Sequence, residues 1–151
     1  MIGGSTPNHT PKSPMQPKNE TLERGGFEIK SSCPILRMLD EDQAKRFYLD
    51  YLGFQVDWEC RFAPKAPLFM QVRLGEACIH LDGHASSDSP ISQVNIPVLG
   101  LQNYCDYLIA KQAKYMKPCL VDPRYVGRDT DMNIEDPFGN LLIFSCQTTE
   151  G

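Results

Sequence analysis

Few residues in this chain could do chemistry, and two neighbouring histidines are the first to consider. His80 and His84 are four residues apart, a spacing that on a helix would present two imidazoles to one zinc ion. Here Asp82 and Gly83 intervene, and the stretch is predicted to be a strand that enters a turn. The two rings should then point in different directions, so we expect no metal site from this pair.

The cysteines form no recognisable metal or redox motif. No two of them are close enough for a CxxC pair, so zinc-ribbon and thioredoxin-like sites lose support. Several fall inside apolar runs, as Cys78 and Cys105 do, and we therefore expect buried free thiols in a reducing cytosol. The six positions are Cys33, Cys60, Cys78, Cys105, Cys119 and Cys146.

Trp58 is the only tryptophan, and it lies between two acidic residues, Asp57 and Glu59. Its ring can stack on a planar heterocycle or attract a cation, although simple packing is the alternative. The net charge of −4 argues against nucleic acid or an anionic membrane as the main partner. A neutral or cationic small molecule suits this charge better.

Residues 1–29 are predicted to be a disordered or weakly ordered N-terminal tail. This segment is rich in proline and polar residues, and Phe27 is its one aromatic residue. It cannot bury enough apolar surface to offset the entropy lost on ordering. We find no apolar core of a secretory signal and no run of about 18 apolar residues, and so expect a cytoplasmic protein with no membrane partner.

The remaining residues, 30–147, repeat one pattern twice. Apolar spacing predicts helices over residues 40–52 and 101–114, the first capped by Asp40 and ended by Gly53. A short strand precedes each helix and three strands follow it. The predicted strands are residues 34–38, 54–62, 68–74 and 77–81 in the first copy, and 94–98, 116–121, 129–135 and 141–146 in the second.

This pattern predicts an α+β fold made of two βαβββ modules related by an internal pseudo-twofold. Module 1 spans about residues 30–84 and module 2 about residues 91–147. One copy alone would leave a sheet face uncovered, so the two should combine into one curved mixed sheet.

Three stretches resemble the glyoxalase and bleomycin-resistance superfamily, also called vicinal oxygen chelate proteins. Residues 47–54 resemble its FYxxxLGF signature, and residues 136–140 resemble the DPxGN hairpin before its last strand. Residues 75–81 are similar to the fourth strand of the first module. The resemblance covers about residues 32–146 and implies the fold of that superfamily. Within the superfamily, residues 56–59 and 79–81 are most similar to the bleomycin-resistance branch.

Catalytic members of this superfamily chelate a divalent metal with ligands from the first and last strands of each module. The resemblance places those positions at Cys33, at His80, near Ile91 or Ser92, and at Ile143. Ile143 stands where the family has a glutamate, and an isoleucine side chain cannot bind a metal. We therefore expect no metal and no cofactor. A soft-metal site at Cys33 and His80 is the alternative. His80 is then either an ordinary hydrogen-bonded core residue or a contact to a ligand.

The resemblance implies a binding protein. Bleomycin-resistance proteins hold the antibiotic in grooves at a dimer interface and perform no reaction. We therefore expect a homodimer without catalytic residues that sequesters an aromatic or cationic small molecule, such as a bleomycin-like compound. The alternative is a metal-dependent lyase, isomerase or dioxygenase of the same superfamily, with a divalent metal as its cofactor.

Strand alternation selects the residues expected to line the groove. Cys78 and His80 should share one face of their strand, while Ile79 and Leu81 pack on a helix. The same rule turns alternate residues of 141–145 towards the groove. The predicted ligand-binding residues are Trp58, His80, Phe62, Met70, Ile143 and Cys33; Phe62 and Met70 would otherwise be core residues.

Overall fold

The computed structural model describes residues 25–111, 113–115 and 131–147, and it divides the chain into units Met1–Ser32 and Cys33–Gly151. The predicted tail therefore lies outside the described residues except for 25–29. The strand predicted over residues 116–121 also lies outside them, as does Cys119. All further description concerns the second unit.

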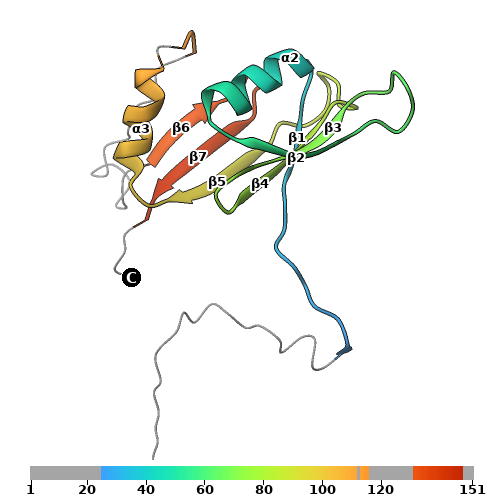
Figure 1. Cartoon of the computed structure of the whole chain (residues 1–151), viewed down its shortest axis with the longest axis horizontal. Helices are drawn as coiled ribbons and strands as arrows, with labels where there is room; N and C mark the ends of the chain where they lie inside the picture. The colour runs from blue at the N-terminus through green and yellow to red at the C-terminus, as the bar shows by residue number, and fades with distance from the viewer. Residues whose placement is uncertain (1–24, 112, 116–130, 148–151) are drawn as a thin grey trace, which may run out of the picture. The chain divides into compact units, whose positions relative to one another are not determined.

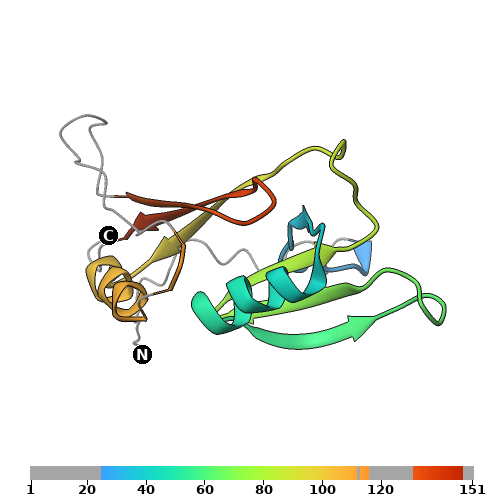
Figure 2. The ribbon, with the colours of Figure 1, turned by 90° about the horizontal axis from the view of Figure 1, so that it is seen from above.

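Module 1 forms a four-stranded sheet with the order β1-β4-β3-β2. Strand β1 pairs parallel with β4, and the other neighbours are antiparallel. Figure 1 shows these strands, and Figure 2 shows the helical segment lying along one face of their sheet. The elements are β1 (Ile35–Arg37), α2 (Glu41–Ala44), η1 (Lys45–Tyr51), β2 (Gln55–Cys60), β3 (Phe69–Leu74) and β4 (Ala77–Asp82).

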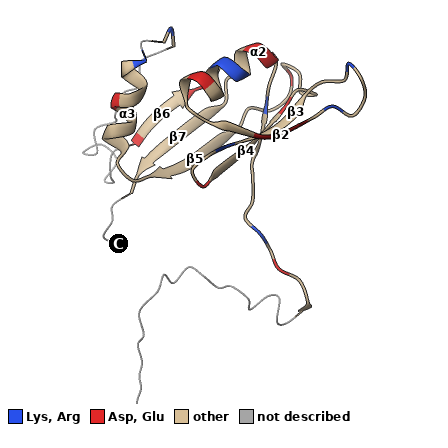
Figure 3. Cartoon of the chain, viewed as in Figure 1, with Lys and Arg blue, Asp and Glu red and all other residues tan. Residues whose placement is uncertain are grey.

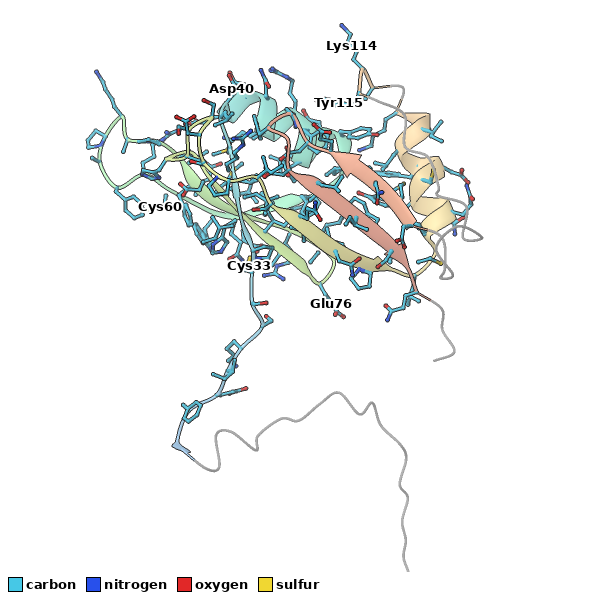
Figure 4. All side chains as sticks on the ribbon, turned by 180° about the vertical axis from the view of Figure 1, so that it is seen from behind. Cys33, Asp40, Cys60, Glu76, Lys114 and Tyr115 are labelled. Atoms are coloured by element: carbon cyan, nitrogen blue, oxygen red, sulfur yellow. A yellow bond between two sulfur atoms is a disulfide. The ribbon has the colours of Figure 1, made fainter. Side chains whose placement is uncertain are left out.

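The first helix begins and ends as the sequence predicts, but its second half is wider. The side chain of Asp40, labelled at the start of α2 in Figure 4, accepts a 2.8 Å hydrogen bond from the backbone of Gln43. Residues 45–51 form a π-helix, in which the amide of Leu52 donates to the carbonyl of Phe47. Gly53 then takes a φ of 96°, which ends the helix in a conformation that favours glycine.

Module 2 repeats this plan in a three-stranded sheet with the order β5-β7-β6. Strand β5 pairs parallel with β7, as β1 does with β4. Helix α3 ends at Ala110, earlier than the predicted residue 114. The elements are β5 (Gln93–Val98), α3 (Leu101–Ala110), β6 (Asp131–Glu135) and β7 (Leu141–Cys146). The α+β prediction is confirmed, but the described strands form two sheets and not the single curved sheet expected, because each of them pairs only within its own module.

Strand alternation separates the core side of each sheet from its other side. Ile79 and Leu81 of β4 are buried against the first helix, and Leu142 and Phe144 of β7 are buried in module 2. Because successive side chains of a strand point to opposite faces, the residues between and beside each buried pair project from the other face of the sheet. The predicted division of β4 into Cys78 with His80 and Ile79 with Leu81 is confirmed.

The buried carboxylate of Asp136 joins the two modules. It accepts a 2.7 Å hydrogen bond from the hydroxyl of Tyr48 in the first helix, and further bonds from the backbone of Phe138 and from the backbone and side chain of Asn140. Burial raises the pKa of Asp136 although these four donors oppose the rise. The hairpin at 136–140 is therefore a turn, as predicted, and also a cross-link between distant segments.

Side chains of Lys111 and Arg37 also connect the modules. Lys111, just after α3, donates to the carbonyls of Asp50 and Tyr51 at the C-terminal end of the first helix. Arg37 of β1 donates to the carbonyl of Phe138 at 2.8 Å.

The described helices include none that is long and apolar enough to cross a membrane.

Replacing Tyr48 by Phe should destabilise the fold. The variant leaves a buried carboxylate with one donor fewer, and hydrogen bonds to charged groups contribute about 1.5–3 kcal/mol. Urea denaturation should show a loss of about that size, whereas Tyr107→Phe, on an exposed ring of α3, should change stability by a few tenths of a kcal/mol. A loss below about 0.5 kcal/mol for Tyr48→Phe would show that this bond does not hold the modules together.

Candidate functional site

The candidate site is the face of the β1-β4-β3-β2 sheet that turns away from the helical segment, and we call it the His80 face. It follows from the pairing register, because His80 lies opposite Ile35 of β1 and Gln71 of β3. Side chains at paired positions project to the same side of a sheet. Residues on the His80 face include Ile35, Trp58, Phe69, Gln71, Arg73, Cys78 and His80, and hydrogen bonds to Gln71 and Arg73 place Asp57 beside them.

A β-bulge in β2 brings two adjacent residues to this face. Pairing shifts between Val56 and Trp58, so that Val56 lies opposite Val72 and Trp58 lies opposite Gln71. Asp57 contacts Gln71 through a hydrogen bond, while the ring of Trp58 contacts His80. A regular strand would send neighbours to opposite faces, and bulges are a known means of redirecting a side chain.

The aromatic part of the His80 face consists of Trp58, Phe69 and His80. The Trp58 and Phe69 rings are stacked, with centroids 5.7 Å apart and planes 29° apart. The imidazole makes a T-shaped contact with both, at 5.2 Å from each centroid and with planes 69° and 74° apart. Trp58 is 39% exposed, an unusual exposure for so large an apolar ring in contact with two others.

A chain of hydrogen bonds orients His80. Gln71 donates from Nε2 to the carboxylate of Asp57 at 2.7 Å, which turns its own carbonyl oxygen Oε1 to Nε2 of His80 at 2.8 Å. A carbonyl oxygen only accepts, so Nε2 of His80 must carry the proton and Nδ1 of the neutral ring keeps a lone pair. The Gln71 bond, and then the pairing with Arg73, lower the pKa of Asp57 and so favour its charged form.

Cys33 and Cys78 form a disulfide, and the prediction of free thiols is wrong for this pair. Figure 4 labels Cys33 where the chain enters the sheet. The pairing of β1 with β4 brings the two residues together although 45 positions separate them in the sequence. Cys60 and Cys146 are free but half-buried, while Cys105 is buried.

The other predicted ligand-binding residues lie apart from the aromatic rings on the His80 face. Met70 is fully buried on the helix side of β3, with Leu81 as its cross-strand neighbour. Phe62 is 72% exposed beyond the end of β2, and its ring contacts His84 at 5.5 Å between centroids. Ile143 lies on β7 of the other sheet, half-buried, on the side away from the core as predicted.

Sequence reasoning missed Gln71 and its partner Asp57. Alternation along 69–74 could have placed Gln71 on the same side as His80. It could not have placed Asp57, because the bulge that turns this side chain leaves no mark in the apolar pattern.

The side chains at the superfamily's metal positions do not fit the family's metal site. Ile143 offers only hydrocarbon, and its cross-strand neighbours Asn95 and Asn133 are amides. The hydroxyl of Ser92 donates to the backbone carbonyl of Ile35. The described part of module 2 therefore supplies neither an imidazole nor a carboxylate at these positions.

Comparison with known proteins supports the assignment that the motifs and the duplicated fold suggest. A family model described as "Glyoxalase superfamily protein" matches residues 17–151, and the chain belongs to this superfamily. No curated protein matches the chain.

Solved structures share the fold at low sequence identity. A glyoxalase family protein from Bacillus anthracis is 15% identical with a TM-score of 0.58, over 80% of this chain and 98% of that one. A bleomycin-binding protein from Streptomyces verticillus in complex with copper(II)-bleomycin is 19% identical with a TM-score of 0.56, over 80% and 98% of the two chains. An antibiotic-binding protein from a Streptomyces species is 15% identical with a TM-score of 0.57, over 80% and 98%.

Proposed function

We propose that this chain is a non-enzymatic binding protein that holds an aromatic or cationic small molecule on the His80 face. The observation that carries the proposal is the half-exposed Trp58 ring, stacked on Phe69 and in T-shaped contact with His80. The stack fixes the orientation of the Trp58 ring, so a planar ligand would lose little further side-chain entropy by stacking on it.

Polar groups beside the rings add specificity to this surface. Asp57 places a carboxylate on the His80 face, and its lowered pKa keeps it charged at neutral pH. Arg73 pairs with this carboxylate at 2.9 Å, so a planar ligand stacked on Trp58 would have an acidic and a basic group beside it that can orient its polar groups. Figure 3 shows acidic and basic residues together on the first helix, which lies along the other face of this sheet in Figure 2.

The structural comparisons support a binding role. Two of the similar structures are described as a bleomycin-binding and an antibiotic-binding protein. The hydrocarbon side chain at Ile143 favours binding over the metal-dependent lyase, isomerase or dioxygenase chemistry of the superfamily, because that chemistry needs the missing donor.

The proposal includes a homodimer whose ligand lies in a groove at the interface. Ile35 is 54% exposed on the His80 face, at the β1 edge of the sheet, and an apolar side chain in this position suits contact with a second copy.

Removing the Trp58 ring should weaken ligand binding. Isothermal titration of the full chain with bleomycin and with the planar cation proflavine should give heat for at least one of them. Trp58→Ala should then lose on the order of 1–3 kcal/mol of binding free energy, the usual contribution of aromatic stacking on a flat ring.

Tyr107→Ala provides the matched control, since it removes a partly exposed aromatic ring on α3, away from the His80 face. Its affinity should equal that of the unaltered chain. An absence of heat with both compounds, or equal losses in the two variants, would contradict a ligand site on the His80 face.

The dimer prediction is tested by sedimentation equilibrium. The unaltered chain should have twice the chain mass, and Ile35→Lys should shift it towards the monomer because a charge would be buried at the interface. Ile109→Lys, at an exposed apolar residue of α3, should remain dimeric. A monomeric mass for the unaltered chain would overturn the prediction.

A further inference from the structure

Three soft donor atoms meet at one corner of the His80 face. They are the sulfur atoms of Cys33 and Cys78 and a ring nitrogen of His80, and all lie within 4.8 Å of one another. In tetrahedral zinc sites with thiolate and imidazole ligands, donor atoms are separated by about 3.5–3.8 Å. Small side-chain rotations would close the difference once the two sulfurs are no longer bonded to each other.

The backbone fixes the three donors in place. Cys78 and His80 are alternate residues of β4 and project from the same face. The amide of His80 donates to the carbonyl of Pro34 at 2.8 Å, which holds the residue after Cys33 against β4. Two of the three donors thus lie on a paired strand, where they are more precisely placed than on a loop, and Cys33 lies two residues before β1.

The hydrogen-bond chain from Asp57 through Gln71 leaves His80 ready to bind a cation. Metal-bound histidines commonly donate their other ring N–H to a carboxylate or a carbonyl, which fixes the tautomer and raises the basicity of the ligand nitrogen. Here Nε2 donates to the carbonyl of Gln71, whose amide is in turn held by Asp57. Nδ1 is the nitrogen left with a lone pair.

We propose that the chain with a reduced Cys33–Cys78 bond binds one thiophilic metal ion of the zinc type through the sulfur atoms of Cys33 and Cys78 and Nδ1 of His80. Two thiolates and one imidazole match the ligand preference of Zn²⁺ and Cu⁺. This donor set lies within module 1, uses Cys78, and needs no ligand from module 2.

The disulfide and the metal site exclude each other. Two molecules of a small thiol reductant convert the disulfide into two cysteine thiols and are themselves oxidised to one disulfide, with two electrons transferred. On binding, the two thiols release two protons and the thiolates neutralise the divalent charge. The corner therefore holds either a covalent cross-link or a metal ion, depending on the redox state.

Three protein ligands leave a fourth tetrahedral position open to water or to a donor atom of a bound molecule. The metal site does not rest on the small-molecule proposal, because it is tested with the metal ion alone. Conversely, the titrations with bleomycin and proflavine are to be made on the oxidised chain, which holds no metal at this corner, so either proposal can fail while the other holds.

Cobalt(II) titration of the full chain gives a direct test, since Co²⁺ occupies zinc sites and reports its ligands in its absorption spectrum. The chain is reduced with a phosphine, desalted without oxygen and titrated with Co²⁺. An oxidised sample is titrated in parallel, after peptide mapping has shown that Cys33 is joined to Cys78. The reduced chain should bind one equivalent with sulfur-to-cobalt charge-transfer bands and tetrahedral visible bands, which Zn²⁺ should abolish. The oxidised chain should show neither.

Variants identify the ligands. The tetrahedral spectrum should be lost in each of the variants Cys33→Ser, Cys78→Ser and His80→Asn. The controls are Cys60→Ser and His84→Asn, which remove one thiol and one imidazole elsewhere in the chain and should keep the spectrum. Circular dichroism of each variant checks that it is folded. The proposal is overturned if the reduced chain shows no charge-transfer bands, if the folded Cys78→Ser variant keeps them, or if they depend on Cys60 or His84.

Discussion

The His80 face depends on one constraint, the burial of alternate residues along β4. Ile79 and Leu81 must pack under the first helix, because exposing them would cost several kcal/mol of apolar burial. Their neighbours Cys78 and His80 are thereby turned to the other side. A slip of one residue in the pairing would exchange the two sets, so the packing of the core also fixes the position of the site.

The second module contributes to this arrangement from a distance. The carboxylate of Asp136 ties the hairpin before β7 to Tyr48 in the first helix, and Asn140 next to it donates to the backbone of Arg37 in β1. The strand that leads from Cys33 is thus held by module 2 as well as by β4. The hairpin therefore has a structural task that does not depend on a donor side chain at Ile143, the position that follows it on β7.

The sequence predicted the features that follow from local pattern and failed on those that follow from pairing between strands. Apolar periodicity located both helices and placed Cys78 and His80 on one face. It could not show the bulge that turns Asp57 and Trp58 to the same side, nor the disulfide, because each depends on the register of a neighbouring strand. Met70 was predicted to line the groove, with a core position as the alternative, and the core position is the one observed: Met70 is paired with the buried Leu81 and faces the core side of β3.

The central claim is that Asp57 and Gln71 hold His80 with its proton on Nε2 and a lone pair on Nδ1. Nitrogen-15 NMR of the imidazole, recorded on the full oxidised chain at a pH where the ring is neutral, tests it directly. We predict a protonated Nε2 and an unprotonated Nδ1, with the preference lost in Gln71→Leu. A ring protonated on Nδ1, or an equal mixture of the two tautomers in the unaltered chain, would contradict the account.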